Sequence, residues 1–159
     1  MSKHRFLVLA AAVAALAGCA TTSTPVSVTD TIAGQSQLST LNGLVTKAGL
    51  GDTLKAGGPY TVFAPTNEAF AKVPAKTMDE LGKDPARLKA VLAYHVVPGK
   101  VMAADVKNGN TKTVNGANVA LSKAGEFVTV EEALVQTADI SATNGVVHIV
   151  DAVLIPPAK

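Results

Sequence analysis

The chain has 159 residues, of which 48% are hydrophobic and 16% charged, and its formal net charge is +2. Two of its cations, Lys3 and Arg5, stand at the N-terminus, so the residues after position 18 carry twelve basic and twelve acidic side chains. Because nucleic-acid surfaces need a basic patch or stripe, this balance excludes nucleic acid as a partner. Cys19 is the single cysteine, so an intrachain disulfide is excluded and the fold must rest on its apolar core.

The first 18 residues have the organisation of an export signal. A short basic stretch precedes an uninterrupted apolar run over residues 6–16. At 1.5 Å per residue, a helix of this length measures about 16 Å, roughly half the thickness of a bilayer core. The run is therefore too short to span a membrane and predicts a signal peptide over residues 1–18.

The residues that follow resemble a lipid attachment site. Leu16-Ala17-Gly18-Cys19 resembles the lipobox of bacterial lipoproteins, in which the cysteine is acylated and becomes the first mature residue. The alternative is an ordinary exported chain that is cut nearby and keeps an unmodified cysteine. Ala20 is similar to the residue found in lipoproteins sorted to the outer membrane, since aspartate there is typical of inner-membrane retention. Residues 19–29 are small and polar after the cysteine and predict a flexible tether between a lipid anchor in the membrane and a domain over residues 30–157.

The first half of this domain carries mainly helical signals. Leu38, Leu41 and Val45 recur at helical spacing, which predicts an amphipathic helix over about residues 36–48 with Gly49 at its C-terminal cap. Residues 60–64 predict a strand, and a short helix is expected from Thr66 to Phe70.

Two further helix starts are predicted from capping residues. The segment Thr77-Met78-Asp79-Glu80 has the Thr-x-x-Glu form of a capping box. Asp84-Pro85 supplies an N-cap followed by proline at the first helical position. The helix after Asp84 has an apolar face formed by Leu88, Val91 and Leu92, with His95 one turn further along.

The second half of the domain predicts strands. Short alternating runs cover residues 111–114, 118–121 and 127–130, and a longer run covers residues 146–155. Asn115-Gly116 and Asn144-Gly145 are two-residue hairpin signals. Because helices come first and closely connected strands later, we predict an α+β fold. The last strand is mostly apolar on both faces, which predicts a central strand covered on two sides.

Three segments, in this order, resemble the motifs of the fasciclin (FAS1) domain family. Residues 61–70 are similar to the first family motif, Tyr94-His95 to its tyrosine–histidine pair, and residues 144–156 to its second motif. The resemblance covers about residues 30–156 and implies a wedge-like pair of β-sheets with several helices packed on them. The motif residues expected to be structural are Thr66, Asn67, Asn144, Gly145 and His148.

The resemblance also implies a secreted or surface-anchored protein that mediates adhesion or binds other extracellular components. In animal members, an Asp-Ile dipeptide before the second motif and the Tyr-His pair are linked to integrin binding. Asp139-Ile140 and Tyr94-His95 match these pairs, and we expect Asp139-Ile140 in a loop or at a sheet edge. The alternative is that Ile140 packs into the core while Asp139 caps a turn.

The two histidines after position 18 are expected to be structural. His95 lies on an apolar helical face, which is typical of a hydrogen-bonded core residue, with Thr66 and Asn67 as expected partners. His148 and Asp151 are three residues apart on a strand, hence on opposite faces, and cannot hold a metal ion together. No catalytic motif or phosphate-binding loop occurs, so we predict neither an enzyme nor a bound cofactor or metal.

Two functions remain open at the level of the sequence. The first is adhesion or protein–protein interaction at the cell surface or in the periplasm, through an envelope, matrix or cell-surface protein or a glycan. The second is a small-ligand carrier or sensor of the envelope, which would need polar groups converging in an apolar pocket. The sequence offers few such groups, so we prefer the first.

Overall fold

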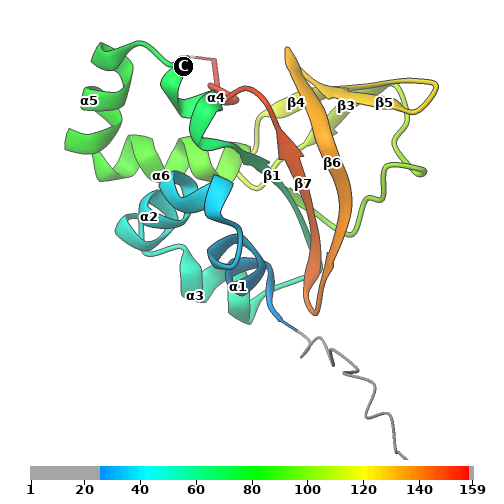
Figure 1. Ribbon diagram of the computed structural model, residues 1–159, viewed down its shortest axis with the longest axis horizontal. Coiled ribbons are helices and arrows are strands. Elements are labelled where there is room, and N and C mark those ends of the chain that lie inside the picture. Colours follow the sequence, from blue (N-terminus) through cyan, green and yellow to red (C-terminus); the bar gives the residue numbers. More distant parts are fainter. Residues whose placement is uncertain (1–25, 158–159) are drawn as a thin grey trace, which may run out of the picture.

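Seven strands lie within residues 26–157, the part of the chain that the computed structural model describes, and they form one sheet in the order β2-β1-β7-β6-β5-β4-β3 (Figure 1). Neighbouring strands are antiparallel except β1 and β7, which run parallel. In chain order the strands are β1 (Tyr60–Pro65), β2 (Val96–Pro98), β3 (Gly109–Lys112), β4 (Asn118–Ala124), β5 (Phe127–Val130), β6 (Ala133–Ala142) and β7 (Gly145–Val150).

The sheet curls until its two outer strands approach each other. Strand β6 pairs with β5 at Ala133 and Leu134 and with β7 from Val135 onward, so it belongs to both halves of the sheet. Beyond β3, the N–H of Val114 donates to the carbonyl oxygen of Val96 in β2 at 2.8 Å. The α+β class is confirmed, and the two expected sheets are one continuous sheet joined at β6.

Two apolar cores occupy the two faces of the sheet because side chains alternate along each strand. Phe63 and Val150 point into the core that the curled sheet encloses, where they meet side chains of β2, β4 and β5. Val62 and Ile149 point to the other face, which the helices cover. Every residue of β7 is buried, so this strand is central and covered on both sides, as predicted.

The helices gather on one side of the sheet, against β1 and β7 (Figure 1). Their buried side chains include Ile32, Leu41 and Leu88.

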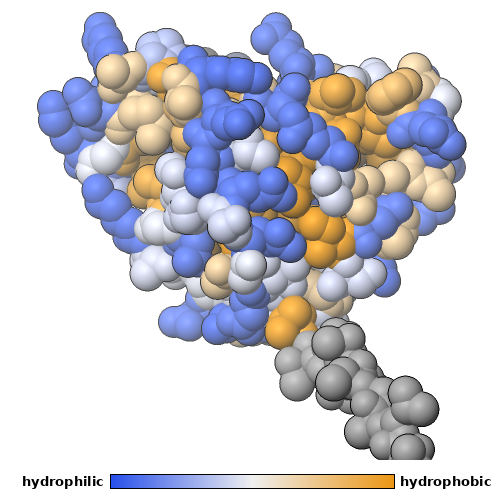
Figure 2. All heavy atoms as spheres, viewed as in Figure 1, coloured by the Kyte–Doolittle hydropathy of each residue, from blue (hydrophilic) through white to orange (hydrophobic). Residues whose placement is uncertain are grey.

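Hydrophilic residues dominate the outer surface over the helices, whereas hydrophobic residues gather over the strands (Figure 2). Within residues 26–157, no helix is both long and apolar enough to cross a membrane. The helices are α1 (Val28–Ala33), α2 (Ser39–Lys47), α3 (Gly51–Ala56), α4 (Asn67–Ala71), α5 (Ala75–Lys83) and α6 (Pro85–Tyr94), and a 3₁₀ turn (Ser36–Leu38) precedes α2.

Capping residues set several helix ends as predicted. The side chain of Asp84 accepts hydrogen bonds from the N–H groups of Ala86 and Arg87, so α6 begins at Pro85. Gly49, at φ 67°, follows α2 in the left-handed conformation, and the N–H of Leu50 closes back on the preceding turn.

Other predicted boundaries are wrong. Helix α5 begins at Ala75, so Thr77 lies inside the helix and makes no cap. Strand β7 ends at Val150, whereas the predicted run extends to residue 155. The residues after Val150 turn toward α6, where the N–H of Leu154 bonds to the His95 ring. The hairpin turn between β6 and β7 consists of residues 143–144, and Gly145 already pairs in β7. The folded region begins before residue 30, since α1 starts at Val28 and buries it fully.

Candidate functional site

The Asp139-Ile140 pair lies inside β6, in the part that pairs with β7 alone, because β5 pairs only with Ala133 and Leu134 of β6. The pair is therefore not in a loop, but it does lie at a local edge of the sheet, one of the two predicted positions. The pairing of β6 with β7 shifts register twice between Val135 and Ile140, and Asp139 adopts a left-handed backbone with φ 59°. An irregular strand of this kind re-aims side chains without leaving the sheet. Ile140 is half-buried against the core below the helices, whereas Asp139 is exposed.

Asp139 is connected to two other parts of the fold. Its carboxylate Oδ1 accepts a 2.7 Å hydrogen bond from the N–H of Ala103, in the segment between β2 and β3. Its own N–H donates to Nδ1 of His148 in β7, at 3.1 Å. Asp139 therefore holds the β2–β3 segment on the sheet. Because Ala103 lies in the Met102–Asp105 turn and Ile140 packs against the core, this arrangement is close to the predicted alternative in which Asp139 caps a turn.

His148 is buried beneath this segment and uses both of its ring nitrogens. Nε2 lies 2.7 Å from the carbonyl oxygen of Val101 and donates to it, while Nδ1 accepts the N–H of Asp139. The ring stacks on Phe63 of β1, with the two centroids 5.6 Å apart. Burial lowers the pKa of His148 below its ordinary value, so the ring is neutral near pH 7.

His95 lies at the C-terminal end of α6 and, like His148, is buried with both ring nitrogens hydrogen-bonded. It is 1% exposed, its Nδ1 donates to the carbonyl oxygen of Val91 at 2.8 Å, and its Nε2 accepts the N–H of Leu154 at 3.0 Å. Burial lowers the pKa of His95 to about 4. Its partners are thus main-chain atoms, not Thr66 and Asn67 as predicted.

Tyr94 is also buried, and it points toward the other end of the sheet. Its hydroxyl lies 3.0 Å from the carbonyl oxygen of Asn118 and 3.1 Å from Oε1 of Glu131, in the turn between β5 and β6. Burial, together with the neighbouring Glu131 carboxylate, raises the pKa of Tyr94 to about 12. Neither member of the Tyr94-His95 pair presents its polar group on the surface.

Thr66 and Asn67 organise the turn between β1 and α4. The hydroxyl of Thr66 accepts the N–H of Ala69 at 3.2 Å and so caps α4. The side chain of Asn67 accepts the N–H of Thr40 at 3.0 Å and donates to the carbonyl oxygen of Ser36 at 3.2 Å. Asn67 therefore joins α4 to α2 and to the 3₁₀ turn, whereas the hydrogen bond of Thr66 stays at the start of α4.

Asn144 connects the β6–β7 turn to the beginning of the domain. Its Oδ1 accepts the N–H of Val28 at 2.8 Å, and its Nδ2 donates to the carbonyl oxygens of Leu54 and Gly57. The next residue, Gly145, touches β1 so closely that a Cβ atom would overlap the backbone of Tyr60. This part of the second motif therefore fixes α1 and α3 against the sheet.

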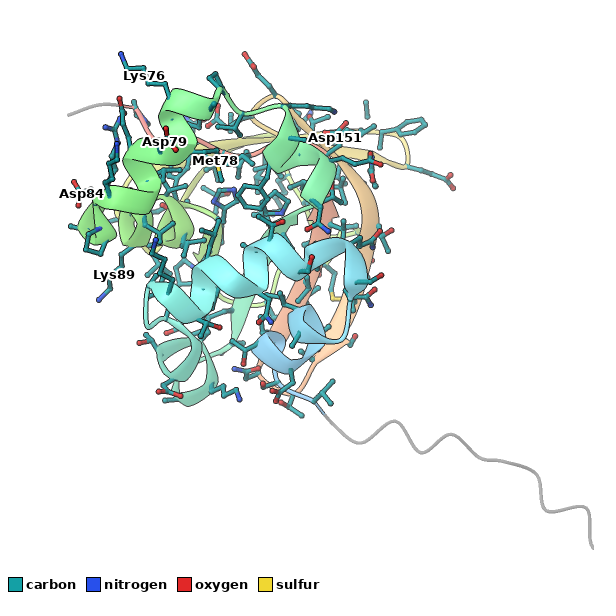
Figure 3. All side chains as sticks on the ribbon, turned by 60° about the vertical axis from the view of Figure 1, so that its left-hand side comes forward. Lys76, Met78, Asp79, Asp84, Lys89 and Asp151 are labelled. Carbon is teal, nitrogen blue, oxygen red and sulfur yellow. The ribbon has the colours of Figure 1, made fainter. Side chains whose placement is uncertain are left out.

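A groove of about 460 Å³ lies between α5, α6 and the segment after β7. Figure 3 shows charged residues of both signs on these helices and between them: Lys76 and Asp79 on α5, Lys89 on α6, and Asp84 at the junction of the two. The walls of the groove are mainly apolar, with polar groups from a threonine, an arginine and an asparagine. Its lining residues include Thr77, Leu81, Arg87, Val91, Asn115 and Ile155.

Metal-binding geometry is not found in residues 26–157, where no three His, Cys, Asp or Glu side chains come together. Lys72, near Asp151, donates to the main-chain oxygen of that residue, and the Asp151 carboxylate accepts the N–H of Leu134. Cys19, the predicted lipidation residue, lies outside the described residues.

The described geometry agrees with the comparison with known families. The family model of the fasciclin domain matches residues 36–156. The chain belongs to the fasciclin domain family. Domains of this family are generally of the adhesion type and non-enzymatic.

Several relatives of this chain carry names. It is 42% identical to protein sll1483 of Synechocystis over 142 residues, which are 87% of this chain and 78% of that protein. It is 45% identical to the immunogenic protein MPB70 of Mycobacterium bovis over 67% of this chain and 54% of that protein. It is 40% identical to the cell surface glycolipoprotein MPB83 of the same species over 68% and 48% of the two chains. The match thus spans about half the length of these two mycobacterial proteins.

A solved structure supports the same fold. The FAS1 domain pair of the insect cell adhesion molecule fasciclin I matches with a TM-score of 0.62 and 23% sequence identity. The match covers 76% of this chain and 46% of that one.

Proposed function

We propose that this protein is a lipid-anchored fasciclin-domain protein of the cell envelope that mediates adhesion or protein–protein interaction. The observation that carries this proposal is the fasciclin match over nearly the whole described domain. The names of two relatives, a cell surface glycolipoprotein and an immunogenic protein, support an exported protein. The signal-like residues 1–18 and Cys19 support attachment by a lipid, with Ala20 favouring the outer membrane.

The attachment point of the tether gives the domain an orientation under this proposal. The carbonyl oxygen of Val26 accepts the N–H of Thr143 at 2.9 Å, so the start of the described chain is held at the β6–β7 turn. Seven residues from Cys19 to Val26 span at most about 24 Å when fully extended. The α1 end of the domain then stays near the lipid, and α4, α5 and the end of β7, at the other end in Figure 1, face away from it.

Among the four candidate partner-binding residues, Asp139 is the one whose side chain is exposed. Tyr94 and His95 are buried, so we propose that they act on binding only by maintaining the fold. Ile140 is half-buried and packs against the core on the helix side of the sheet, whereas the Asp139 carboxylate lies on the other side, at Ala103. The proposed contact therefore centres on the Asp139 carboxylate, for a protein or glycan partner that offers a donor to it.

A cell-attachment experiment tests the proposal. Cells that lack the gene would be complemented with the full chain or with Cys19→Ala, and surface attachment and cell aggregation would be measured at equal expression. We expect attachment to be restored by the full chain and lost with Cys19→Ala. Equal attachment in cells with and without the full chain would refute an adhesive role.

The groove between α5 and α6 favours a second candidate function, the binding of a small ligand. Its volume of about 460 Å³ falls within the range of small-molecule sites, and Arg87 and Asn115 add polar groups to apolar walls. Native mass spectrometry of the protein taken gently from envelopes would detect a co-purified molecule. Ala90→Trp would fill the groove, with Ala86→Trp, on an exposed part of α6, as control; a molecule retained by both variants would exclude this site.

A further inference from the structure

The Met102–Asp105 turn between β2 and β3 is held on the sheet by two different kinds of contact. Just before the turn, the hydroxyl of Thr61 donates to the carbonyl oxygen of Gly99 at 2.7 Å and accepts the N–H of Val101 at 2.8 Å. These contacts do not change with pH. The next two contacts join the carbonyl oxygen of Val101 to His148 and the N–H of Ala103 to Asp139. The ionisation of these two side chains can change with pH.

His148 and Asp139 together form a closed chain of three hydrogen bonds. Nε2 of His148 donates to the carbonyl oxygen of Val101, Nδ1 accepts the N–H of Asp139, and the Asp139 carboxylate accepts the N–H of Ala103. Only a neutral ring with its proton on Nε2 satisfies all three. We propose that His148 and Asp139 are an acid-sensitive latch that holds the Val101–Ala103 segment against β6 and β7 at neutral pH and releases Ala103 in acid.

The release follows from where the second proton must go. A protonated His148 carries hydrogen on Nδ1 as well, so two donors, Nδ1–H and the N–H of Asp139, then face each other across a contact of 3.1 Å. The Asp139 carboxylate is the adjacent anion, and it turns from the N–H of Ala103 to the imidazolium. Ala103 loses its acceptor, while the Thr61 contacts retain Gly99 and Val101 as a hinge.

The surroundings of His148 set the direction of the pH response. From β6, Asp139 favours the protonated ring; β1 presents the uncharged Phe63, and the covering segment presents the Val101 carbonyl. Lys100 and Asp105, the ionisable residues flanking the segment, are exposed. Burial outweighs the attraction of Asp139, so the pKa of His148 stays below 6.5 and the latch is closed at neutral pH.

The backbone conformation of Asp139 favours opening of the latch. A non-glycine residue at φ 59° is held in a sparsely populated conformation by its surroundings, here by the hydrogen bonds to His148 and Ala103. Losing one of these bonds lets the irregular part of β6 relax. The latch therefore couples the ring of His148 to the exposed carboxylate of Asp139 and to the Met102–Asp105 turn.

Hydrogen exchange tests the latch on the mature protein as purified from cells, without any partner. Amide protection of Ala103, corrected for the intrinsic effect of pH, would be measured between about pH 7 and pH 4.5. We expect it to fall by about tenfold, the change for one net hydrogen bond, while amides of β1 and β7 stay protected. In His148→Gln, the amide keeps a donor for Val101 but does not titrate, and we expect pH-independent protection.

Several results would overturn the latch. Ala103 protection that stays unchanged in acid in the natural protein would do so. An equal loss of Ala103 protection in His148→Gln would also overturn it. A simultaneous loss of protection in β1 and β7 would indicate global unfolding instead of a local release. If His148→Gln does not fold, nitrogen NMR of the natural protein decides the question. It should show the Nε2–H tautomer of His148 at neutral pH and protonation in the range in which Ala103 is released; the Nδ1–H tautomer would exclude the mechanism.

Discussion

Acid should destabilise this fold chiefly through His95, and the size of the effect can be worked out from the structure. The ring is buried, and its pKa is about 4 in the folded protein against 6.5 when unperturbed. The unfolded chain therefore binds the proton more tightly, so stability is retained above pH 6.5 and lost as the pH falls toward 4. At 1.36 kcal/mol per pH unit, this difference corresponds to about 3 kcal/mol of unfolding free energy lost between those pH values.

Urea unfolding at about pH 7.5, 6, 5 and 4 would measure this loss, with His95→Gln as the comparison. The glutamine can satisfy only one of the two main-chain partners, so we expect it to lower stability at neutral pH by about 1–3 kcal/mol. Because it does not titrate, its free energy of unfolding should fall less steeply with acid, and the two proteins should converge near pH 4. If the free energies of unfolding of His95→Gln and of the natural protein fall in parallel from pH 7.5 to 4, the reasoning is refuted.

Three further predictions concern the anchor, the β6–β7 turn and the contact residues. Cys19→Ala should move the protein from the membrane fraction to the soluble or precursor pool, since each buried acyl methylene contributes about 0.8 kcal/mol; natural protein that fractionates as soluble would contradict a lipid anchor. Asn144→Ala should lower the free energy of unfolding by about 2–4 kcal/mol through loss of the contacts to α1 and α3, measured by urea unfolding. Asn144→Asp, which keeps the acceptor, should cost less, and an equal cost would refute this account. Asp139→Ala combined with Ile140→Ala should abolish attachment in the cell assay while the domain stays folded; attachment that persists, or that falls only as far as folding does, would remove this pair as a contact.

The sequence alone was sufficient for features that depend on nearby residues. The cap of α6 at Asp84-Pro85 and the glycine after α2 involve partners within one helical turn. Strands β1 and β5 were predicted within a residue of their ends because their apolar or alternating runs are bounded by turn residues. The family motifs were sufficient for the fold, because they occur in order over nearly the whole domain.

Strand β6 shows what the sequence did not determine. Its residues around Asp139 lack a regular alternation, because the strand changes register twice where it passes from β5 to β7. A strand whose irregularity is maintained by the β2–β3 segment and by β7 has no local pattern to detect. The sequence therefore left open a loop or an edge for Asp139, and only the strand pairing places it at an edge within β6.

The roles of the two histidines were decided only by tertiary structure. The sequence indicated that both would be satisfied within the protein, since imidazole beside apolar residues needs partners. It could not name them, because Leu154 is 59 positions from His95 and Val101 is 47 positions from His148. Such hydrogen bonds form only after α6, β6 and β7 have packed, and the same packing sets the burial that keeps both rings neutral.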